Sequence, residues 1–304
     1  MIYTVTLNPS LDYYVQVNNF KVGFVNRVVG ERLAVGGKGI NVSLALRELG
    51  EDTLAIGFVA GFTGKAIKDK MKSLGLDFNF LDVDGQSRIN VKIKGNTETD
   101  INGTGAHVSS TDMNALTRKL KSLLKEGDWL VISGSVPKTL DEQTYGNLLK
   151  RLKTVHGVNV VIDAYGKLLT ETLKYRPFLI KPNMYELSDI FALPTNTPSL
   201  EQIFDCAHKL QKMGARNVIV SMGSSGAAMV TETSQSIYVR AARGQLVNSV
   251  GAGDSMIAGF IHEYCKSGNY FSALNYACAA GSACAFTKNI ATKEQIEYIE
   301  SLML

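Results

Sequence analysis

The chain has 304 residues, enough to bury a sizeable core as one α/β domain or as one domain with an appendage. Its 32 basic and 28 acidic residues nearly cancel, so the charge balance favours neither nucleic acid nor a charged membrane as a partner. No apolar run reaches the roughly 18 residues that span a bilayer, and the start lacks a basic leader, so we expect a cytoplasmic protein.

The cysteines and histidines carry no metal or redox signature. The chain has no C-x-x-C pair and no histidine at zinc-ligand spacing from a cysteine, so we predict buried, reduced thiols. The histidines are scattered, and none is assigned a role. These residues are Cys206, Cys265, Cys278, Cys284, His107, His156, His208 and His262.

Short β-branched runs alternate with amphipathic helical stretches along the chain. Several runs are apolar at consecutive positions, as expected of parallel strands covered on both faces. The predicted strands are Ile2–Leu7, Leu54–Val59, Trp129–Ser133, Val158–Asp163, Phe178–Lys181 and Val218–Met222. The predicted helices are Asn41–Leu49, Lys65–Leu74, Asp112–Lys125, Asp141–Val155 and Ser199–Met213, with Gly50, Gly75, Gly127, Gly157 and Gly214 at or just past their ends. This rhythm predicts an α/β fold with a doubly wound, mainly parallel sheet.

Two segments, Asp12–Val35 and Ser87–Gly103, break this rhythm. Ser87–Gly103 alternates with a two-residue period, which predicts a strand with one dry and one wet face. We therefore predict that both segments form a small antiparallel sheet, or lid, projecting from a single domain that spans residues 1–304. On the wet face Lys92 and Lys94 are interpreted as solvated, whereas Arg88 faces either solvent or a ligand.

Two stretches near the start contain candidate ligand contacts. In Asn8–Asp12, which follows the first strand, Asp12 is either an ordinary turn residue or an acceptor for sugar hydroxyls. Gly36–Asn41 is a glycine turn that opens a helix, where the backbone approaches a ligand closely, Lys38 supplies a charge and Asn41 a donor and an acceptor. A purely structural turn is the alternative, and the lysine favours ligand contact.

Two later stretches follow strand ends. Asn183 and Glu186 have the spacing of a helix-capping pair, and spacing alone favours capping. At a strand end, Glu186 could instead organise hydrated Mg²⁺ beside nucleotide phosphates. Ser221–Gly226 lies between two apolar runs and is either a loose hairpin or a small-residue surface for a flat nucleotide.

Two common nucleotide-binding motifs are absent. The chain has no G-x-G-x-x-G, which argues against a nicotinamide dehydrogenase. Gly64-Lys65 resembles part of a Walker motif, but Val59 and Ala66 occupy the positions of the first glycine and of the hydroxyl residue, so we reject a P-loop.

The stretch Asn248–Ser255 is the most informative in the chain. Glycines lead into Asp254 and then into an apolar run, which predicts a tight turn opening a helix. Free amides at such a start bind anions, so they can hold a transferring phosphoryl group while Asp254 takes the proton of an attacking hydroxyl. The alternative is a turn whose carboxylate merely complements the helix dipole.

Together, Gly36–Asn41 and Gly251–Asp254 resemble the two signatures of the ribokinase-like, phosphofructokinase B family of carbohydrate kinases. The likeness runs over nearly the whole chain and is strongest to the branch that acts on phosphorylated ketohexoses. The other stretches that carry it are Thr4–Ser10, Asn26-Arg27, Arg88–Lys94 and Asn248–Val250. The chain departs from the pattern at Leu44, where relatives often have arginine, and at Ala164-Tyr165, which replaces a small hydroxyl pair.

The resemblance implies a ribokinase-like fold and an enzyme that uses ATP and Mg²⁺. It implies phosphoryl transfer to the 6-hydroxyl of fructose 1-phosphate, giving fructose 1,6-bisphosphate. Tagatose 6-phosphate and fructose 6-phosphate are alternative acceptors, and a non-catalytic sensor of sugar phosphate or nucleotide is an alternative of another kind. The small sheets of two subunits pair in many relatives, so a homodimer through the lid is also implied.

The resemblance also assigns roles to residues. Asp254 is the implied catalytic base, with Gly251, Ala252 and Gly253 as anion-hole amides. Asp12, Gly37, Lys38 and Asn41 would contact the sugar, and Arg88 with Arg27 its phosphate, which suits the planar fork of arginine. The implied nucleotide and metal residues are Lys181, Asn183, Glu186 for Mg²⁺, Gly253, Ser221, Met222, Gly223, Ser224, Ser225 and Gly226.

Overall fold

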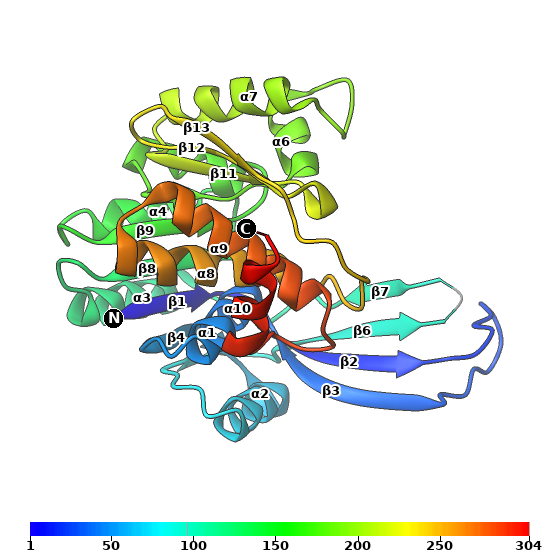
Figure 1. The fold of residues 1–304 in the computed structure, drawn as a ribbon. Coiled ribbons are helices and arrows are strands. Elements are labelled where there is room, and N and C mark those ends of the chain that lie inside the picture. Colours follow the sequence, from blue (N-terminus) through cyan, green and yellow to red (C-terminus); the bar gives the residue numbers. More distant parts are fainter. Residues whose placement is uncertain (96, 304) are drawn as a thin grey trace.

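A nine-stranded, mainly parallel sheet forms the centre of the molecule (Figure 1). This computed structural model describes residues 1–95 and 97–303. The strands are β1 (Ile2–Thr6), β4 (Thr53–Val59), β5 (Leu81–Asp82), β8 (Trp129–Ser133), β9 (Asn159–Asp163), β10 (Leu179–Ile180), β11 (Asn217–Ser221), β12 (Ala227–Val230) and β13 (Ser236–Val239). Their order is β13-β12-β11-β10-β9-β8-β1-β4-β5, and the β11–β12 and β12–β13 pairs are antiparallel whereas the other pairs are parallel.

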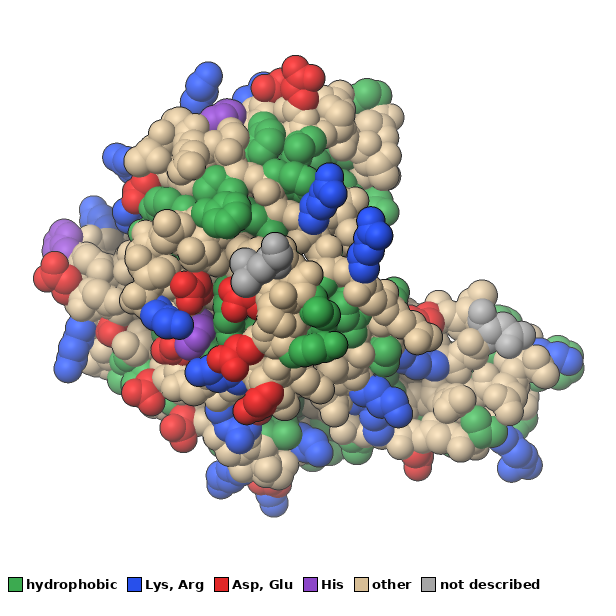
Figure 2. Space-filling model, in the orientation of Figure 1, with side chains coloured by type: hydrophobic (Ala, Val, Ile, Leu, Met, Phe, Trp, Pro, Cys, Tyr) green, Lys and Arg blue, Asp and Glu red, His purple; other side chains and the backbone are tan. Residues whose placement is uncertain are grey.

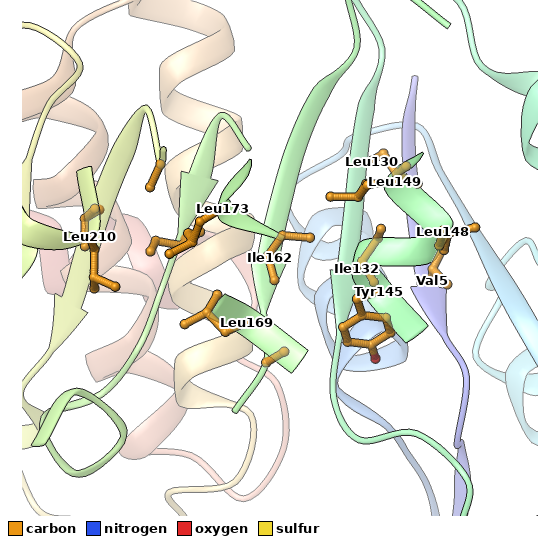
Figure 3. Close-up of a cluster of buried hydrophobic side chains, with 14 of the residues drawn as sticks. Val5, Leu130, Ile132, Tyr145, Leu148, Leu149, Ile162, Leu169, Leu173 and Leu210 are labelled. Carbon is orange, nitrogen blue, oxygen red and sulfur yellow. The ribbon is translucent and has the colours of Figure 1, made fainter. Parts of the chain in front are cut away.

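Helices cover both faces of this sheet, which confirms the doubly wound prediction. One face carries α3 (Ser110–Leu123), α4 (Thr144–Leu152), α5 (Lys167–Thr170), α6 (Met184–Phe191) and α7 (Leu200–Lys212). The other carries α1 (Lys38–Glu48), α8 (Ala252–Ser267), α9 (Tyr270–Ala285) and α10 (Lys293–Ser301), while α2 (Gly61–Ser73) packs beside β4. Figure 3 shows the hydrophobic core between the sheet and the helices of the first face, where Val5 and Ile132 of the sheet lie near Tyr145 and Leu148 of α4.

The predicted elements are present with small shifts at their ends. The five glycines expected to end helices all adopt positive φ, as left-handed caps require. α4 begins at Thr144 rather than at Asp141, because the Asp141 carboxylate accepts from Gln143 N (3.0 Å) in a turn before the helix. None of the helices in the two described ranges is long and apolar enough to cross a bilayer.

The predicted lid is a separate four-stranded sheet of β2 (Ser10–Gln16), β3 (Gly30–Gly36), β6 (Arg88–Lys94) and β7 (Thr99–Asn102), in the order β3-β2-β6-β7. It projects from the main body, as Figure 2 shows on the right. β2–β3 and β6–β7 are antiparallel as predicted, whereas the central β2–β6 pair is parallel. The reason is that β2 and β6 each begin a hairpin that leaves the main body in the same direction.

The two faces of the lid differ in character. Asp12, Asn90 and Arg88 lie on the even-numbered face, which is polar. The odd-numbered face is apolar but not fully dry within one chain: Leu33 is 53% exposed, Ile89 41% and Ile101 57%. The dry face predicted from the alternation is therefore only partly covered by the chain itself.

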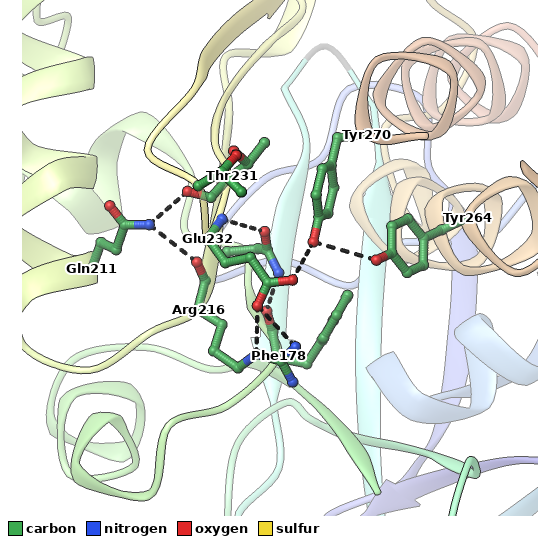
Figure 4. A network of polar contacts seen from close by, with 9 residues as sticks. Phe178, Gln211, Arg216, Thr231, Glu232, Tyr264 and Tyr270 are labelled. Atoms are coloured by element: carbon green, nitrogen blue, oxygen red, sulfur yellow. Dashed lines mark hydrogen bonds and ion pairs between the residues drawn. The ribbon is translucent and has the colours of Figure 1, made fainter. Parts of the chain in front are cut away.

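A polar network ties the antiparallel edge of the main sheet to α8 and α9 (Figure 4). Glu232 accepts from Arg216 Nε at 2.8 Å and from the Tyr270 hydroxyl at 2.7 Å. The Tyr264 hydroxyl of α8 donates to Tyr270 at 3.3 Å, and Gln211 Nε2 donates to Thr231 O at 2.6 Å. These bonds fix α8 and α9 against the edge of the sheet, and the first turn of α8 contains Asp254.

The strand order reverses at β1. The chain passes from β1 to β4 on one side and later to β8 on the other. In open α/β sheets, ligands bind beyond the carboxyl ends of the strands at such a switch point. The same edge receives the first turns of α1 and α8, so the two glycine motifs lie where a ligand site is expected.

Candidate active site

The first turn of α8 has open backbone amides. Gly251 precedes it with φ of 86°, a conformation that favours glycine, and no side chain caps the helix. The Ala252 amide donates to Ser249 O at 3.3 Å. Within the described chain no acceptor is found for the amides of Gly253 and Asp254, so these two groups at the positive end of the helix dipole are available to an anion.

Asp254 is buried beside this turn, with 5% of its surface exposed. Its Oδ2 accepts from Asn41 Nδ2 at 2.8 Å, so residues 213 positions apart join the starts of α8 and α1. Burial, followed by the nearby carboxylate of Asp163, raises the pKa of Asp254 to about 6. Asp254 is thus still ionised at neutral pH but binds a proton more readily than an exposed carboxylate.

Asp163, at the end of β9, is a residue that the sequence reasoning missed. Its Oδ1 lies 3.1 Å from Lys38 Nζ and 3.6 Å from Lys181 Nζ, and its side chain is 1% exposed. Burial opposes the charge, but the two ammonium groups outweigh it and hold the pKa of Asp163 below its usual value. The signal was an acidic residue ending an apolar strand at the ligand-binding edge of the sheet.

Both lysines of this cluster lie close enough to act on the charge of Asp254. Burial opposes the charge of Lys38, but Asp163 and Asp254 outweigh it and raise the lysine pKa. A Cβ added to Gly253 would lie 3.1 Å from Lys181 Nζ, so the ammonium group lies close against the backbone of the first turn of α8. Amides and ammonium groups together make this turn electrostatically favourable for an anion.

Close approach also explains the first glycine motif. A Cβ on Gly36 would lie 2.5 Å from Asp12 Oδ2, and one on Gly39 would lie 2.5 Å from Thr6 Oγ1. Gly37 has φ of 128°, which other residues rarely adopt. These glycines let β3 and α1 pack closely against the end of β1. Lys38 and Asn41 therefore lie in the first turn of α1, directly beside the base of the lid.

Polar side chains of the lid converge on Asp12. Its Oδ1 accepts from Ser10 Oγ at 2.6 Å and from Asn90 Nδ2 at 2.9 Å. Arg88, half-buried on the same face, donates from Nε to Asn8 O at 3.0 Å. The terminal guanidinium nitrogens of Arg88 have no acceptor in the described chain, which leaves their fork for an anion. Asn90 was not among the predicted site residues.

The residues predicted to bind the nucleotide follow the ends of β10 and β11. Asn183 Oδ1 accepts from Glu186 N and Glu186 Oε2 accepts from Asn183 N, both at 2.9 Å, so the capping pair is present. Ser221 N donates to Pro182 O at 3.0 Å, which places the hairpin next to this cap. The Ser221–Gly226 hairpin holds the short helix η2 (Gly223–Ser225) and buries the Met222 side chain in the core.

Arg27 stands apart from the other predicted substrate contacts. It is exposed in the loop of residues 17–29 that joins β2 to β3 at the far end of the lid (Figure 1). The strand from Asp12 to Gln16 alone spans about 13 Å at 3.3 Å per residue. The structure therefore does not bring Arg27 to Arg88 within one chain.

Comparisons with known proteins agree with this geometry. Residues 6–296 match the family described as pfkB family carbohydrate kinase. The chain is 41% identical to 1-phosphofructokinase of Bacillus subtilis over 98% of this chain and 97% of that protein, and 33% identical to D-tagatose-1-phosphate kinase of Bacillus licheniformis over 99% and 98%. Phosphofructokinase-2 of Escherichia coli, solved with potassium, shares the fold with a TM-score of 0.92 at 24% identity, covering 99% of this chain and 98% of that one. The chain therefore belongs to the pfkB family of carbohydrate kinases.

Proposed function

We propose that this kinase transfers the γ-phosphoryl group of ATP to the 6-hydroxyl of fructose 1-phosphate. The observation that carries the proposal is the buried Asp254 carboxylate beside the open amides of α8, bonded to Asn41 at 2.8 Å. The 41% identity to a 1-phosphofructokinase supports the choice of sugar. The polar lid face and Arg88 lie at the same edge and offer contacts for hydroxyls and for the 1-phosphate.

In the proposed step the sugar oxygen attacks the γ-phosphorus in line with the departing ADP. The hydroxyl proton passes to an Asp254 oxygen as the new P–O bond forms and the bond to the β-phosphate oxygen breaks. The amides of Gly253 and Asp254, with Lys181 beside them, stabilise the negative charge on the transferring group. Lys38 keeps a positive charge between Asp163 and Asp254 throughout the step.

We further propose that Mg²⁺ accompanies the nucleotide. No group of three or more His, Cys, Asp or Glu side chains suited to a metal occurs in the described ranges, which fits an ion held mainly by phosphates and water. The buried Asp163 Oδ2 has no partner, and Glu186 uses one oxygen in its cap, so these carboxylates are the candidates to orient the bound water. When bound, Mg²⁺ would neutralise charge on the β- and γ-phosphates.

We also propose a single kinase domain that pairs through its lid as a homodimer. The exposed odd-numbered face, with Leu33, Ile89 and Ile101, supports this pairing. In such a dimer, Arg27 of one chain could reach the sugar phosphate bound to the other chain, which it does not reach in its own chain.

We propose the cytoplasm as the location of the protein. The four cysteines are unpaired, which supports this location.

The first prediction concerns the sugar. We expect the highest kcat/KM for fructose 1-phosphate, measured beside tagatose 1-phosphate, tagatose 6-phosphate and fructose 6-phosphate with ADP release as the readout. Tagatose 1-phosphate is the second candidate, because a 33% identical relative is a D-tagatose-1-phosphate kinase. A preference for either 6-phosphate would refute the assignment of the acceptor hydroxyl, and no turnover with any of the four would point to a sensor.

The second prediction concerns Asp254. We expect Asp254→Asn to lower kcat by roughly 10²–10⁴ while sugar-phosphate binding changes little. The variant should melt at the same temperature as the parent or higher at pH 8, since it removes a buried carboxylate whose raised pKa marks a cost of ionisation in the folded state. Asp205→Asn, an exposed acid on α7, is the control. Near-normal turnover of Asp254→Asn would remove this residue from the mechanism.

The third prediction is the acid limb of the pH profile. The pKa of Asp254 is raised to about 6, so the carboxylate becomes protonated as pH falls through that value and can no longer accept a proton. The rate should therefore fall about tenfold per pH unit below this point, and much of it should return on readjustment to pH 7.5. A flat rate from pH 5 to 8 would contradict the proposed base.

The fourth prediction separates the two roles of Glu186. Glutamine can replace glutamate in a capping box, so Glu186→Gln should hardly change the melting temperature. If the carboxylate orients Mg²⁺, the Mg²⁺ concentration for half-maximal rate rises several-fold at fixed ATP. Asp112→Asn, in the equivalent capping box of α3, is the matched control. An unchanged Mg²⁺ requirement in Glu186→Gln would leave only the cap.

The fifth prediction tests Arg27 by subunit mixing. Arg27→Ala should raise the KM for the sugar phosphate roughly tenfold or more. When Arg27→Ala and Asp254→Ala chains are co-expressed, half of the random dimers contain one chain of each kind. In such a dimer the Arg27→Ala chain keeps its own Asp254 and receives Arg27 from its partner, so one of its two sites is intact and about a quarter of all sites should be active. Arg88→Ala with Asp254→Ala is the control and should recover none, since both residues serve the same site of one chain. Equal behaviour of the two mixtures would refute the contribution of Arg27 across the dimer.

A further inference from the structure

A cavity apart from the active site lies between α3 and α4. Its volume is about 550 Å³. It is bounded by the segment of residues 107–109, the first turns of α3, the loop of residues 138–141 and one side of α4. Two bonds between Thr139 Oγ1 and the backbone of Val108, at 2.9 and 3.0 Å, join the loop to the opposite wall. These bonds fix the relative position of the two walls.

The lining combines an apolar floor with a cationic rim. Val108, Met113 and Leu148 are buried at the floor, with 1%, 8% and 1% of their surfaces exposed. Lys138 and Arg151 lie on the exposed rim. Such a surface suits a small organic anion whose carbon body contacts the floor while its acidic groups face the cations.

The positive charge of this rim is not neutralised locally. Lys138 has no ion pair or side-chain hydrogen bond to any described residue, and Arg151 donates to the neutral Asn114. The one lining carboxylate, Asp141, accepts from two neutral donors, Gln143 N at 3.0 Å and Thr144 Oγ1 at 3.3 Å, and its single negative charge offsets only one of the two cations. His107 also lies at the rim. The available charge of the cavity is thus cationic.

Short contacts connect the cavity to the substrate site. Tyr145 follows the lining residue Thr144 in α4, and its hydroxyl donates to Gly134 O at 3.0 Å (Figure 3 shows this ring). A Cβ on Gly134 would lie 3.7 Å from the Lys38 side chain, so this backbone borders Lys38.

A second connection runs through the loop that leads to Lys138. Val136 O accepts from Asn8 Nδ2 at 3.4 Å, and Asn8 O accepts from Arg88 Nε at 3.0 Å. These contacts link the loop and α4 to the surroundings of Lys38 and Arg88.

We propose that this cavity binds a small metabolite with two acidic groups, each a carboxylate or a phosphate, and that its occupancy changes the affinity of the active site for the sugar phosphate. Lys138 and Arg151 bind the two acidic groups. The ligand acts through the loop and α4 rather than on Asp254, so it changes KM more than kcat. A coupling of this kind is reciprocal: the sugar phosphate changes the affinity for the anion by the same factor.

The test uses 3-phosphoglycerate, which carries one carboxylate and one phosphate, with the full-length protein in titration calorimetry. Lys138→Ala with Arg151→Ala should weaken its binding at least tenfold, because each lost charge-assisted contact is worth about a factor of ten or more. Lys150→Ala with Lys153→Ala is the matched control: both lysines are exposed near the end of α4 and do not line the cavity, and the change in net charge is the same. Arg88→Ala, which alters the active site, should leave this binding intact.

Kinetics give the second readout. In the parent enzyme, 3-phosphoglycerate should change the KM for fructose 1-phosphate at least threefold, and the Lys138/Arg151 double variant should lose this response while its basal kcat stays within about twofold. The proposal fails if the parent does not bind the probe, or if both double variants lose binding equally. It also fails if Arg88→Ala abolishes binding, which would locate the probe in the active site, or if bound probe leaves KM unchanged.

Discussion

The buried carboxylate of Asp163 is the interaction on which the arrangement of this site depends. A charge that is 1% exposed is costly unless it is paired, and here two ammonium groups pair with it. Lys38 comes from the start of α1 and Lys181 from the end of β10, so the ion cluster fixes a helix and two strands relative to one another. It also sets the environment of Asp254, because the Asp163 carboxylate adds to burial in raising the pKa of Asp254 while both lysines act against it.

Much of the fold could be predicted from local pattern. Strands such as Trp129–Ser133 are apolar at consecutive positions, and burial on both faces leaves little alternative to a parallel sheet. The glycine turns were also recognisable, since a positive φ or a close backbone approach excludes other residues. The resemblance of both motifs to one family then placed Asp254 and Lys38 in a common site.

The features that were missed depend on contacts between distant segments. Asp163 looked like the last residue of a strand, and only the fold shows that lysines from two other elements surround it. The parallel pairing of β2 with β6 depends on how two hairpins leave the body, which alternation does not encode. Arg27 carried a family likeness, but the length of the lid separates it from Arg88, a distance that sequence does not reveal.

The capping pair at α6 shows that two interpretations posed as alternatives need not compete. Glu186 completes the cap with Oε2, while its Oε1 makes no bond within the described chain. The helix cap then holds the carboxylate in a fixed orientation at the edge where nucleotide is proposed to bind. Stability and ligand placement are in this case supplied by the same side chain.

The direct passage from β3 into α1 has a consequence for how the chain tolerates change in length. Ser10 pairs with Gly36, and α1 starts two residues later, so no flexible linker separates the lid from Lys38 and Asn41. One inserted residue in this junction would either flip the faces of β3 or rotate the helix by about 100°. Residues 18–25, exposed at the outer end of the lid, lie outside this junction, so we expect changes of length to be tolerated there rather than at the root of the lid, as long as Arg27 keeps its position.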